Sequence, residues 1–167
     1  VFKIVTAAAA IEKNAVTPDR RFNCNQTLYG DGRADRQLGM LTFAQSFVQS
    51  CNHTFGEVAN KLIKSDPDTL ETFAKRLGFV GPVGWHGPVY HIESLSHFPN
   101  ETPGTVWKND SYKNNPESVA QTAIGQLNVR VSPLAIADVM AAIARGGKKL
   151  AVRAATTVEY QNGASLA

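Results

Sequence analysis

The stretch Ser50-Cys51-Asn52-His53 places a hydroxyl, an amide and an imidazole in the middle of the chain's most regular amphipathic run. Ser and Asn compete with the helical backbone for hydrogen bonds, so they favour helix ends and breaks. A serine hydroxyl is also a weak nucleophile that needs an adjacent base. A Ser-x-Asn tripeptide at a helix junction is most often only a cap. It therefore indicates chemistry only if a basic group elsewhere in the chain meets it.

Apolar residues on both sides of this stretch recur at intervals of three and four, which predicts helices that face a core. They are Ala44, Phe47, Val48 and Cys51 before it, and Phe55, Val58, Ala59, Leu62 and Ile63 after it. We expect a helix, a tight corner and a second helix, with Ser50 and Asn52 displayed at the corner. Thr42 and Gln45 form a capping-box pattern that opens the first of these helices.

Residues 1–13 have the pattern of another helix, which ends with Lys13 in its last turn and Asn14 as a left-handed cap. No Ser, Thr, Asp or Asn precedes it, so we expect the chain to be cut inside a helix or at its N-terminus. On this helix alone, Lys3 would be interpreted as a solvent-facing lysine.

The composition is that of an ordinary soluble domain. The 167 residues suffice for one domain with a sizeable core, with 43% hydrophobic and 19% charged residues. A net charge of +3, from 17 basic and 14 acidic residues, is too mild to indicate nucleic-acid binding. The longest apolar run, residues 4–11, is far short of the roughly 20 that a membrane span needs. No Cys/His cluster has zinc spacing, and we expect neither a metal nor a cofactor.

The two cysteines, Cys24 and Cys51, allow one disulfide. Cys51 lies on the apolar stripe, and this position favours a small buried hydrophobic side chain over a bonded one.

The remaining segments are predicted from caps, turns and periodicity. They are a turn at 17–19, an extended segment at 21–29, a helix from Asp66-Pro67 to Gly78, a long loop over 81–115 with a hairpin around 89–92, a helix from Asn115-Pro116 to Gly125, a helix from Ser132-Pro133 to Gly146 and a strand at 151–160. The helix after Ser132 is apolar almost all round, which predicts that it is buried.

Three segments resemble motifs of one known family. Val1-Phe2-Lys3 looks like the end of a Ser-x-x-Lys motif whose serine would precede Val1, and Ser50-Cys51-Asn52, about fifty residues later, looks like its Ser-x-Asn motif. The segment 121–147 is similar to the part that follows in these proteins. Together they resemble the transpeptidase domain of penicillin-binding proteins, most like class B. Two departures are the missing serine and the missing Lys-Thr-Gly strand.

The resemblance implies a fold in which a helical lobe packs on a central sheet, with the site at their junction. We therefore expect residues 1–167 to be a partial transpeptidase domain, a mainly α fragment of an α/β fold with most of the sheet missing. It implies catalytic roles for Lys3 and Ser50: a neutral Lys3 as base, with its pKa lowered by burial or nearby positive charge, and Ser50 as proton relay. Asn52 would hold the substrate amide. Gln126 is interpreted as a helix-end polar residue.

The same resemblance implies a peptidoglycan D,D-transpeptidase that acts on D-Ala-D-Ala stem peptides through an acyl-serine and is stalled by β-lactams. It also implies wall-synthesis proteins as partners and a place on the extracytoplasmic face of the bacterial membrane, held by an N-terminal anchor outside this sequence. Without the serine and the Lys-Thr-Gly strand, the chain alone is expected to be inactive.

Three alternatives remain open on the sequence. A serine β-lactamase shares the first two motifs but needs a deacylating carboxylate, and the surroundings of Glu117 do not resemble the relevant loop. A β-lactam sensor domain has the same fold and binds without turnover. A helical interaction module is the non-enzymatic alternative.

Overall fold

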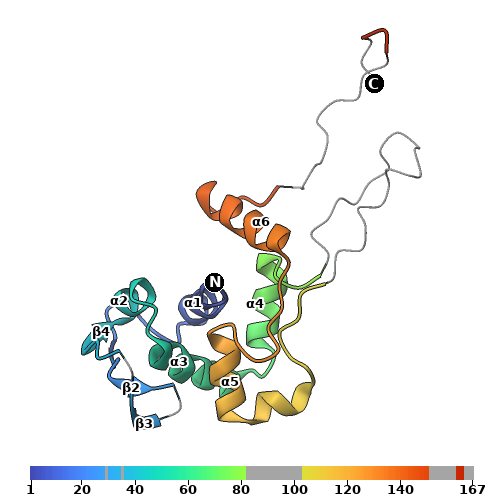
Figure 1. Cartoon of the computed structure of the whole chain (residues 1–167). Helices are drawn as coiled ribbons and strands as arrows, with labels where there is room; N and C mark the ends of the chain where they lie inside the picture. The colour runs from blue at the N-terminus through green and yellow to red at the C-terminus, as the bar shows by residue number, and fades with distance from the viewer. Residues whose placement is uncertain (29, 35, 82–102, 151–160, 164–167) are drawn as a thin grey trace.

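The computed structural model of the chain describes residues 1–28, 30–34, 36–81, 103–150 and 161–163 (Figure 1). The hairpin predicted around 89–92 and the strand predicted at 151–160 lie outside these residues. Within them, no helix combines the length and the apolar character needed to cross a bilayer.

The described part is mainly helical, as predicted. Its elements in chain order are α1 (Lys3–Glu12), β1 (Arg21–Asn23), β2 (Gln26–Thr27), β3 (Gly30–Arg33), β4 (Met40–Thr42), α2 (Phe43–Val48), α3 (Asn52–Ser65), α4 (Thr69–Leu77), the 3-10 helix η2 (Asp110–Asn114), α5 (Pro116–Ala123) and α6 (Pro133–Ala144). The strands form two antiparallel pairs, β1 with β4 and β2 with β3. In the first pair Phe22 lies opposite Leu41.

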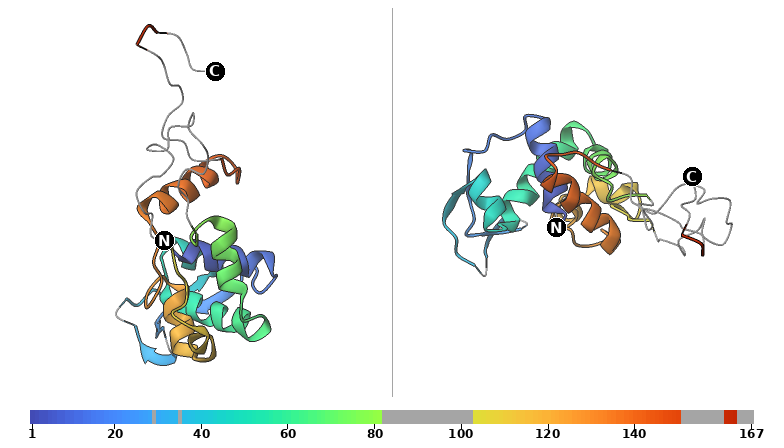
Figure 2. Two further views of the ribbon diagram at one scale, coloured as in Figure 1. Left: turned by 90° about the vertical axis from the view of Figure 1, so that its right-hand side faces the viewer. Right: turned by 90° about the horizontal axis from the view of Figure 1, so that it is seen from above.

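Helix α3 contacts α1, α4 and α5, and in Figure 1 it lies between α2 and α5, below α1; Figure 2 gives two further views. Its apolar stripe is buried, with Phe55 and Ala59 fully inaccessible to solvent. The approach of α5 is close at Gly56, where an added Cβ would lie 3.0 Å from the Ala120 Cβ. The core therefore fixes α3, and with it the corner that precedes α3, against the first helix of the chain.

Local sequence signals place most helix ends correctly. Thr42 and Gln45 form both bonds of the predicted capping box. The Asn115 and Ser132 side chains cap α5 and α6. Asn14 has φ +52°, the predicted left-handed conformation after α1.

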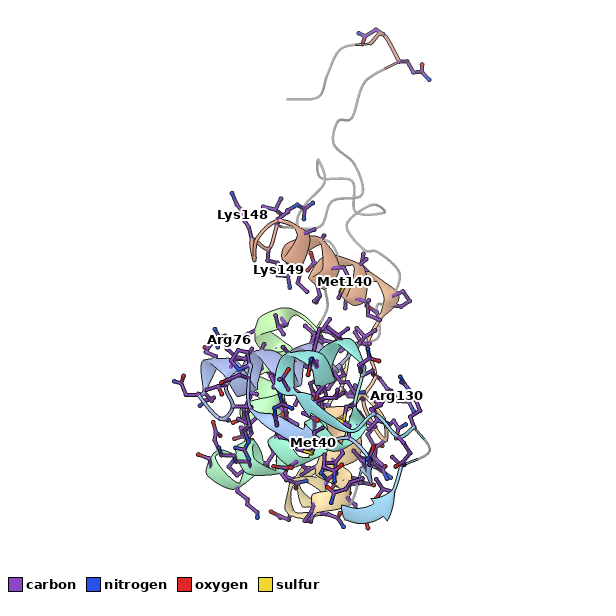
Figure 3. The ribbon with its side chains drawn as sticks, turned by 90° about the vertical axis from the view of Figure 1, so that its left-hand side faces the viewer. Met40, Arg76, Arg130, Met140, Lys148 and Lys149 are labelled. Atoms are coloured by element: carbon purple, nitrogen blue, oxygen red, sulfur yellow. A yellow bond between two sulfur atoms is a disulfide. The ribbon has the colours of Figure 1, made fainter. Side chains whose placement is uncertain are left out.

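Two predictions about the later helices are wrong in part. Helix α4 begins at Thr69 rather than directly after Asp66, because Asp66 first closes a turn in which its carbonyl accepts from the Thr69 N–H. Helix α6 is not buried all round: Ala135 and Val139 are covered, whereas Met140 and Ile143 are 39% and 53% exposed. It lies at the outer end of the described body, above α4 in Figure 1, with Met140 along it and Lys148 beyond it in Figure 3.

Candidate active site

The structure brings together the three residues that the sequence singled out. The Lys3 ammonium nitrogen lies 2.6 Å from the Ser50 hydroxyl oxygen and 2.6 Å from the Asn52 side-chain oxygen. It also donates to the Ser50 backbone carbonyl at 2.7 Å. Lys3 comes from the first turn of α1, and the other two come from the corner between α2 and α3, 47 and 49 positions away. The first turn of α1 and the α2–α3 corner therefore meet in one hydrogen-bonded cluster.

The corner is built by a backbone motif that ends α2. The Cys51 N–H donates to the Ser46 carbonyl at 2.9 Å, and the Ser50 N–H donates to the Phe47 carbonyl at 3.2 Å. This pair of bonds is a Schellman motif, which requires a left-handed residue directly after the helix C-cap, here Gln49. Ser50 is that residue, with φ +57°. The turn exposes the Ser50 side chain at the predicted corner, and α3 begins directly after it, at Asn52.

The environment of Lys3 favours its neutral form. Burial, together with the positive charge of the nearby Arg36 guanidinium, lowers the pKa of Lys3 from 10.5 to about 8. The ammonium nitrogen lies over the Phe55 ring, 5.5 Å from its centroid, in cation–π range. An ammonium has three N–H donors, and here three oxygens are positioned to accept them. A lysine with a pKa near neutrality is suited to act as a general base.

The first turn of α1 is held in place by packing. Phe2 is buried and meets the Phe79 ring edge-on, with the ring centroids 5.7 Å apart. Gly125, with φ +85°, passes so close that an added Cβ would lie 2.9 Å from the Phe2 Cβ. One turn further, the buried Thr6 hydroxyl donates to the Ala123 carbonyl at 2.8 Å. The end of α5 therefore positions Lys3 through its neighbours.

Cys24 and Cys51 form a disulfide, which corrects the interpretation of Cys51 as an unbonded buried residue. Cys24 follows β1, and its backbone N–H pairs with the Gly39 carbonyl next to β4. The bond therefore links the corner to the β1–β4 pair. Both cysteine side chains are buried, which would hold for free thiols as well as for a disulfide. What identifies the disulfide is that the two sulfurs, 27 positions apart in the sequence, lie at bonding distance.

Three further residues support the corner, and of these the sequence had singled out only the imidazole of His53, while Ser46 and Thr54 were missed. The buried hydroxyls of Ser46 and Thr54 lie 3.0 Å apart, and each is within 3.6 Å of the Cys24 sulfur. His53 Nδ1 donates to the Thr27 carbonyl at 2.7 Å, which ties β2 to α3. The signal for Thr54 was available, since it is a hydroxyl three positions after Cys51 on an otherwise apolar helix face.

Ser50 and Asn52 also line a cavity of about 280 Å³ beside the β2–β3 hairpin. Glu117, the carboxylate that a deacylating enzyme would need, lines a different cavity that Lys61 and Pro116 share. Gln126 is exposed just beyond α5, where its backbone N–H donates to the Gln121 carbonyl.

Comparison with known proteins gives matches over nearly the whole chain. The family model described as the penicillin binding protein transpeptidase domain matches residues 1–165. The peptidoglycan D,D-transpeptidase PbpA of Mycobacterium tuberculosis is 28% identical over 159 residues, a match that covers 87% of this chain. The chain spans only 28% of the length of that relative.

Solved structures share the fold. Penicillin-binding protein A from M. tuberculosis, in its ceftriaxone acyl-enzyme complex, matches with a TM-score of 0.70 at 23% identity, over 98% of this chain and 35% of that one. A chain of a peptidoglycan synthase complex, described for its coordination of polymerization and crosslinking, matches with a TM-score of 0.67 at 27% identity, over 90% of this chain and 26% of that one.

Proposed function

Because the chain belongs to the family of penicillin-binding protein transpeptidase domains, we propose that it is part of a serine-type peptidoglycan D,D-transpeptidase. The observation that carries the proposal is the single hydrogen-bonded cluster of Lys3, Ser50 and Asn52. It unites an amine of lowered pKa with a hydroxyl that can both accept and donate a proton. General acid–base transfer to and from a nucleophile needs these two groups.

The nucleophile in this proposal is a serine that precedes Val1 in the complete protein. Such a residue lies one helical turn before Lys3, on the same face of α1. Neutral Lys3 takes the proton of that serine while its oxygen bonds to the carbonyl carbon of the penultimate D-Ala. The bond to the terminal D-Ala nitrogen then breaks. Ser50 passes a proton from Lys3 to that leaving nitrogen, so that D-Ala departs as a neutral amine and Lys3 is neutral again.

The second half-reaction uses the same groups in reverse. The amine of a second stem peptide approaches the acyl-serine, loses a proton through Ser50 to Lys3 and forms the new amide. The serine oxygen leaves and takes its proton back from Lys3. Asn52 holds the substrate amide during both steps, and this requires its side chain to keep the exposed position that it has beside Ser50. A β-lactam enters as a donor and stops at the acyl-enzyme.

The location follows from the substrate and is supported by the disulfide. Stem peptides lie outside the cytoplasmic membrane, so we place the complete protein on the extracytoplasmic face, held by an anchor elsewhere in its chain and working with other wall-synthesis proteins. The Cys24–Cys51 bond is compatible with that compartment, because disulfides persist where the surroundings are oxidising.

Covalent labelling by a fluorescent penicillin tests the proposal. The complete protein should take up one label, and Lys3→Gln should label far more slowly. Lys64→Gln, which removes an exposed lysine of α3, should label like the wild type. The chain of residues 1–167 alone should take up none. Stoichiometric labelling of this chain would overturn the assignment of the nucleophile.

The rival functions give different results in the same assay. Continuous hydrolysis of the penicillin by the complete protein would indicate a β-lactamase. Labelling without release of D-Ala from a D-Ala-D-Ala peptide would indicate a sensor. No labelling of the complete protein would leave only a binding module.

A further inference from the structure

The cavity beside Ser50 and Asn52 has walls of different chemistry. Leu28 and Leu38 give it apolar surface, Gln26 adds an amide, and Arg36 brings a guanidinium. The Cys24–Cys51 disulfide forms part of the wall and fixes the corner to it. Its volume of about 280 Å³ is at the small end for ligand pockets, so it suits one residue of a peptide rather than a whole small molecule.

The Arg36 guanidinium is held at the edge of this cavity with donors to spare. One of its nitrogens donates to the Gln49 carbonyl at 3.3 Å, which is one of five N–H donors in use. Among the side chains that the structure describes, none forms an ion pair with Arg36. A guanidinium with unused N–H donors can bind a carboxylate through two parallel hydrogen bonds.

The positive charge of Lys3 and Arg36 near the corner also favours an anionic ligand. Arg36 lies near enough to Lys3 to lower the pKa of that amine, so two cationic groups share one small region. Like charges in such proximity oppose each other, and a bound anion would offset the repulsion. The neighbouring Glu57 carboxylate is already engaged, since it pairs with Arg20 at 3.3 Å.

We propose that this cavity is a subsite for a carboxylate carried by a residue of the peptide substrate other than its C-terminus, and that Arg36 binds that carboxylate. The subsite rests on the proposed transpeptidase function, because Ser50 and Asn52 form its wall toward the reacting amide. The apolar side of the cavity covers the stem of that residue, and Arg36 makes a specificity-determining contact outside the reacting atoms.

The experiment compares two D-Ala-D-Ala peptides that differ only in whether the internal residue ends in a carboxylate or a carboxamide. The complete protein should release D-Ala from the carboxylate peptide with a kcat/KM about five- to tenfold higher, the scale expected for one charge-assisted contact at a solvent-exposed arginine. Arg36→Gln should bring this ratio to about one, and Arg36→Lys should keep part of it. Lys148→Gln, which removes a positive charge beyond α6, should keep all of it (Figure 3).

Replacing Arg36 also changes the pKa of Lys3. This change affects the kcat/KM values of both peptides equally, so it cancels when the two values are divided within each variant. In a second arm of the experiment the donor peptide is kept the same, and the carboxylate or carboxamide is placed on the acceptor peptide instead. Discrimination in the release of D-Ala assigns the subsite to the donor, and discrimination only in the transfer step assigns it to the acceptor. An unchanged ratio in Arg36→Gln, or no discrimination in either arm, overturns the subsite. Loss of penicillin labelling in the wild type would instead overturn the proposed function.

Discussion

Removing the disulfide should lower the stability of the domain substantially without dismantling the site. Cys24 and Cys51 are 27 positions apart. Cross-linking a loop of about this length removes about 12 cal/mol/K of entropy from the unfolded chain, or about 3.5 kcal/mol at 25 °C. In a domain of 150–250 residues such a change corresponds to a melting temperature lower by about 7–14 °C, and in a larger domain by less. Cys24→Ala/Cys51→Ala should show this loss in the complete protein.

The corner itself has supports that do not depend on the sulfurs. The two Schellman hydrogen bonds close the turn, and Lys3 bonds to both Ser50 and Asn52. We therefore expect the folded double-alanine variant to be labelled by penicillin at a rate within about threefold of wild type, a change of less than 0.7 kcal/mol in the barrier by the usual conversion.

Thermal unfolding and penicillin labelling, each with and without dithiothreitol, measure both effects. Reductant should lower the melting temperature of the wild type toward that of the double variant and leave the double variant unchanged, which serves as the matched control. Equal melting temperatures for the oxidised wild type and the double variant would refute the cross-link argument. Loss of labelling at a temperature where the variant is folded would show that the corner depends on the disulfide.

Three further predictions follow from the site and its supports. Because the pKa of Lys3 lies at about 8, roughly one molecule in ten carries the neutral base at pH 7, and the labelling rate should rise with pH through about 8 and then level off; a rise centred near 10.5 would contradict the lowered pKa. Gly125→Ala should destabilise the protein by about 1–3 kcal/mol in chemical denaturation and slow labelling, since its Cβ would push on Phe2 and its φ of +85° disfavours any side chain. Thr42→Ala should cost about 1 kcal/mol of stability through the lost capping box and leave labelling unchanged.

Features set by neighbours in the sequence could be predicted from it. The capping box of Thr42, the cap of Asn115 and the left-handed Asn14 each depend on a few adjacent residues. The corner at Ser50 and Asn52 belongs to this class too, because polar residues interrupt the apolar pattern there. The core-facing stripe predicted before the corner is wrong, since Ala44, Phe47 and Val48 are exposed and α2 buries Phe43 and Ser46 instead. The meeting of Lys3 with that corner is different. It was predicted only through the family resemblance, since no local signal brings residues 47 positions apart together.

Features that depend on distant partners were missed for the same reason. The bond between Cys24 and Cys51 requires β1 to lie beside the corner, and neither cysteine's local pattern indicates this. Arg36 sits in a polar loop whose sequence shows no periodicity, so its approach to Lys3 could not be read from it. The burial of α6 was overestimated. An apolar pattern indicates that a helix tends to pack against other elements, but it does not tell how many of its residues the described part of the chain buries.

Ser50 departs from the usual residue choice at its position in the backbone. Gly is the usual residue in the left-handed position after a helix, and a residue with a Cβ costs roughly 1–2 kcal/mol more there. Glycine would form the same Schellman bonds but would remove the hydroxyl that lies 2.6 Å from the Lys3 nitrogen. The left-handed turn also directs two successive carbonyls at the two cations, Ser50 to Lys3 and Gln49 to Arg36. The left-handed residue therefore holds Lys3 and Arg36 through one piece of backbone, and a change that relaxes this turn should disturb the positions of both.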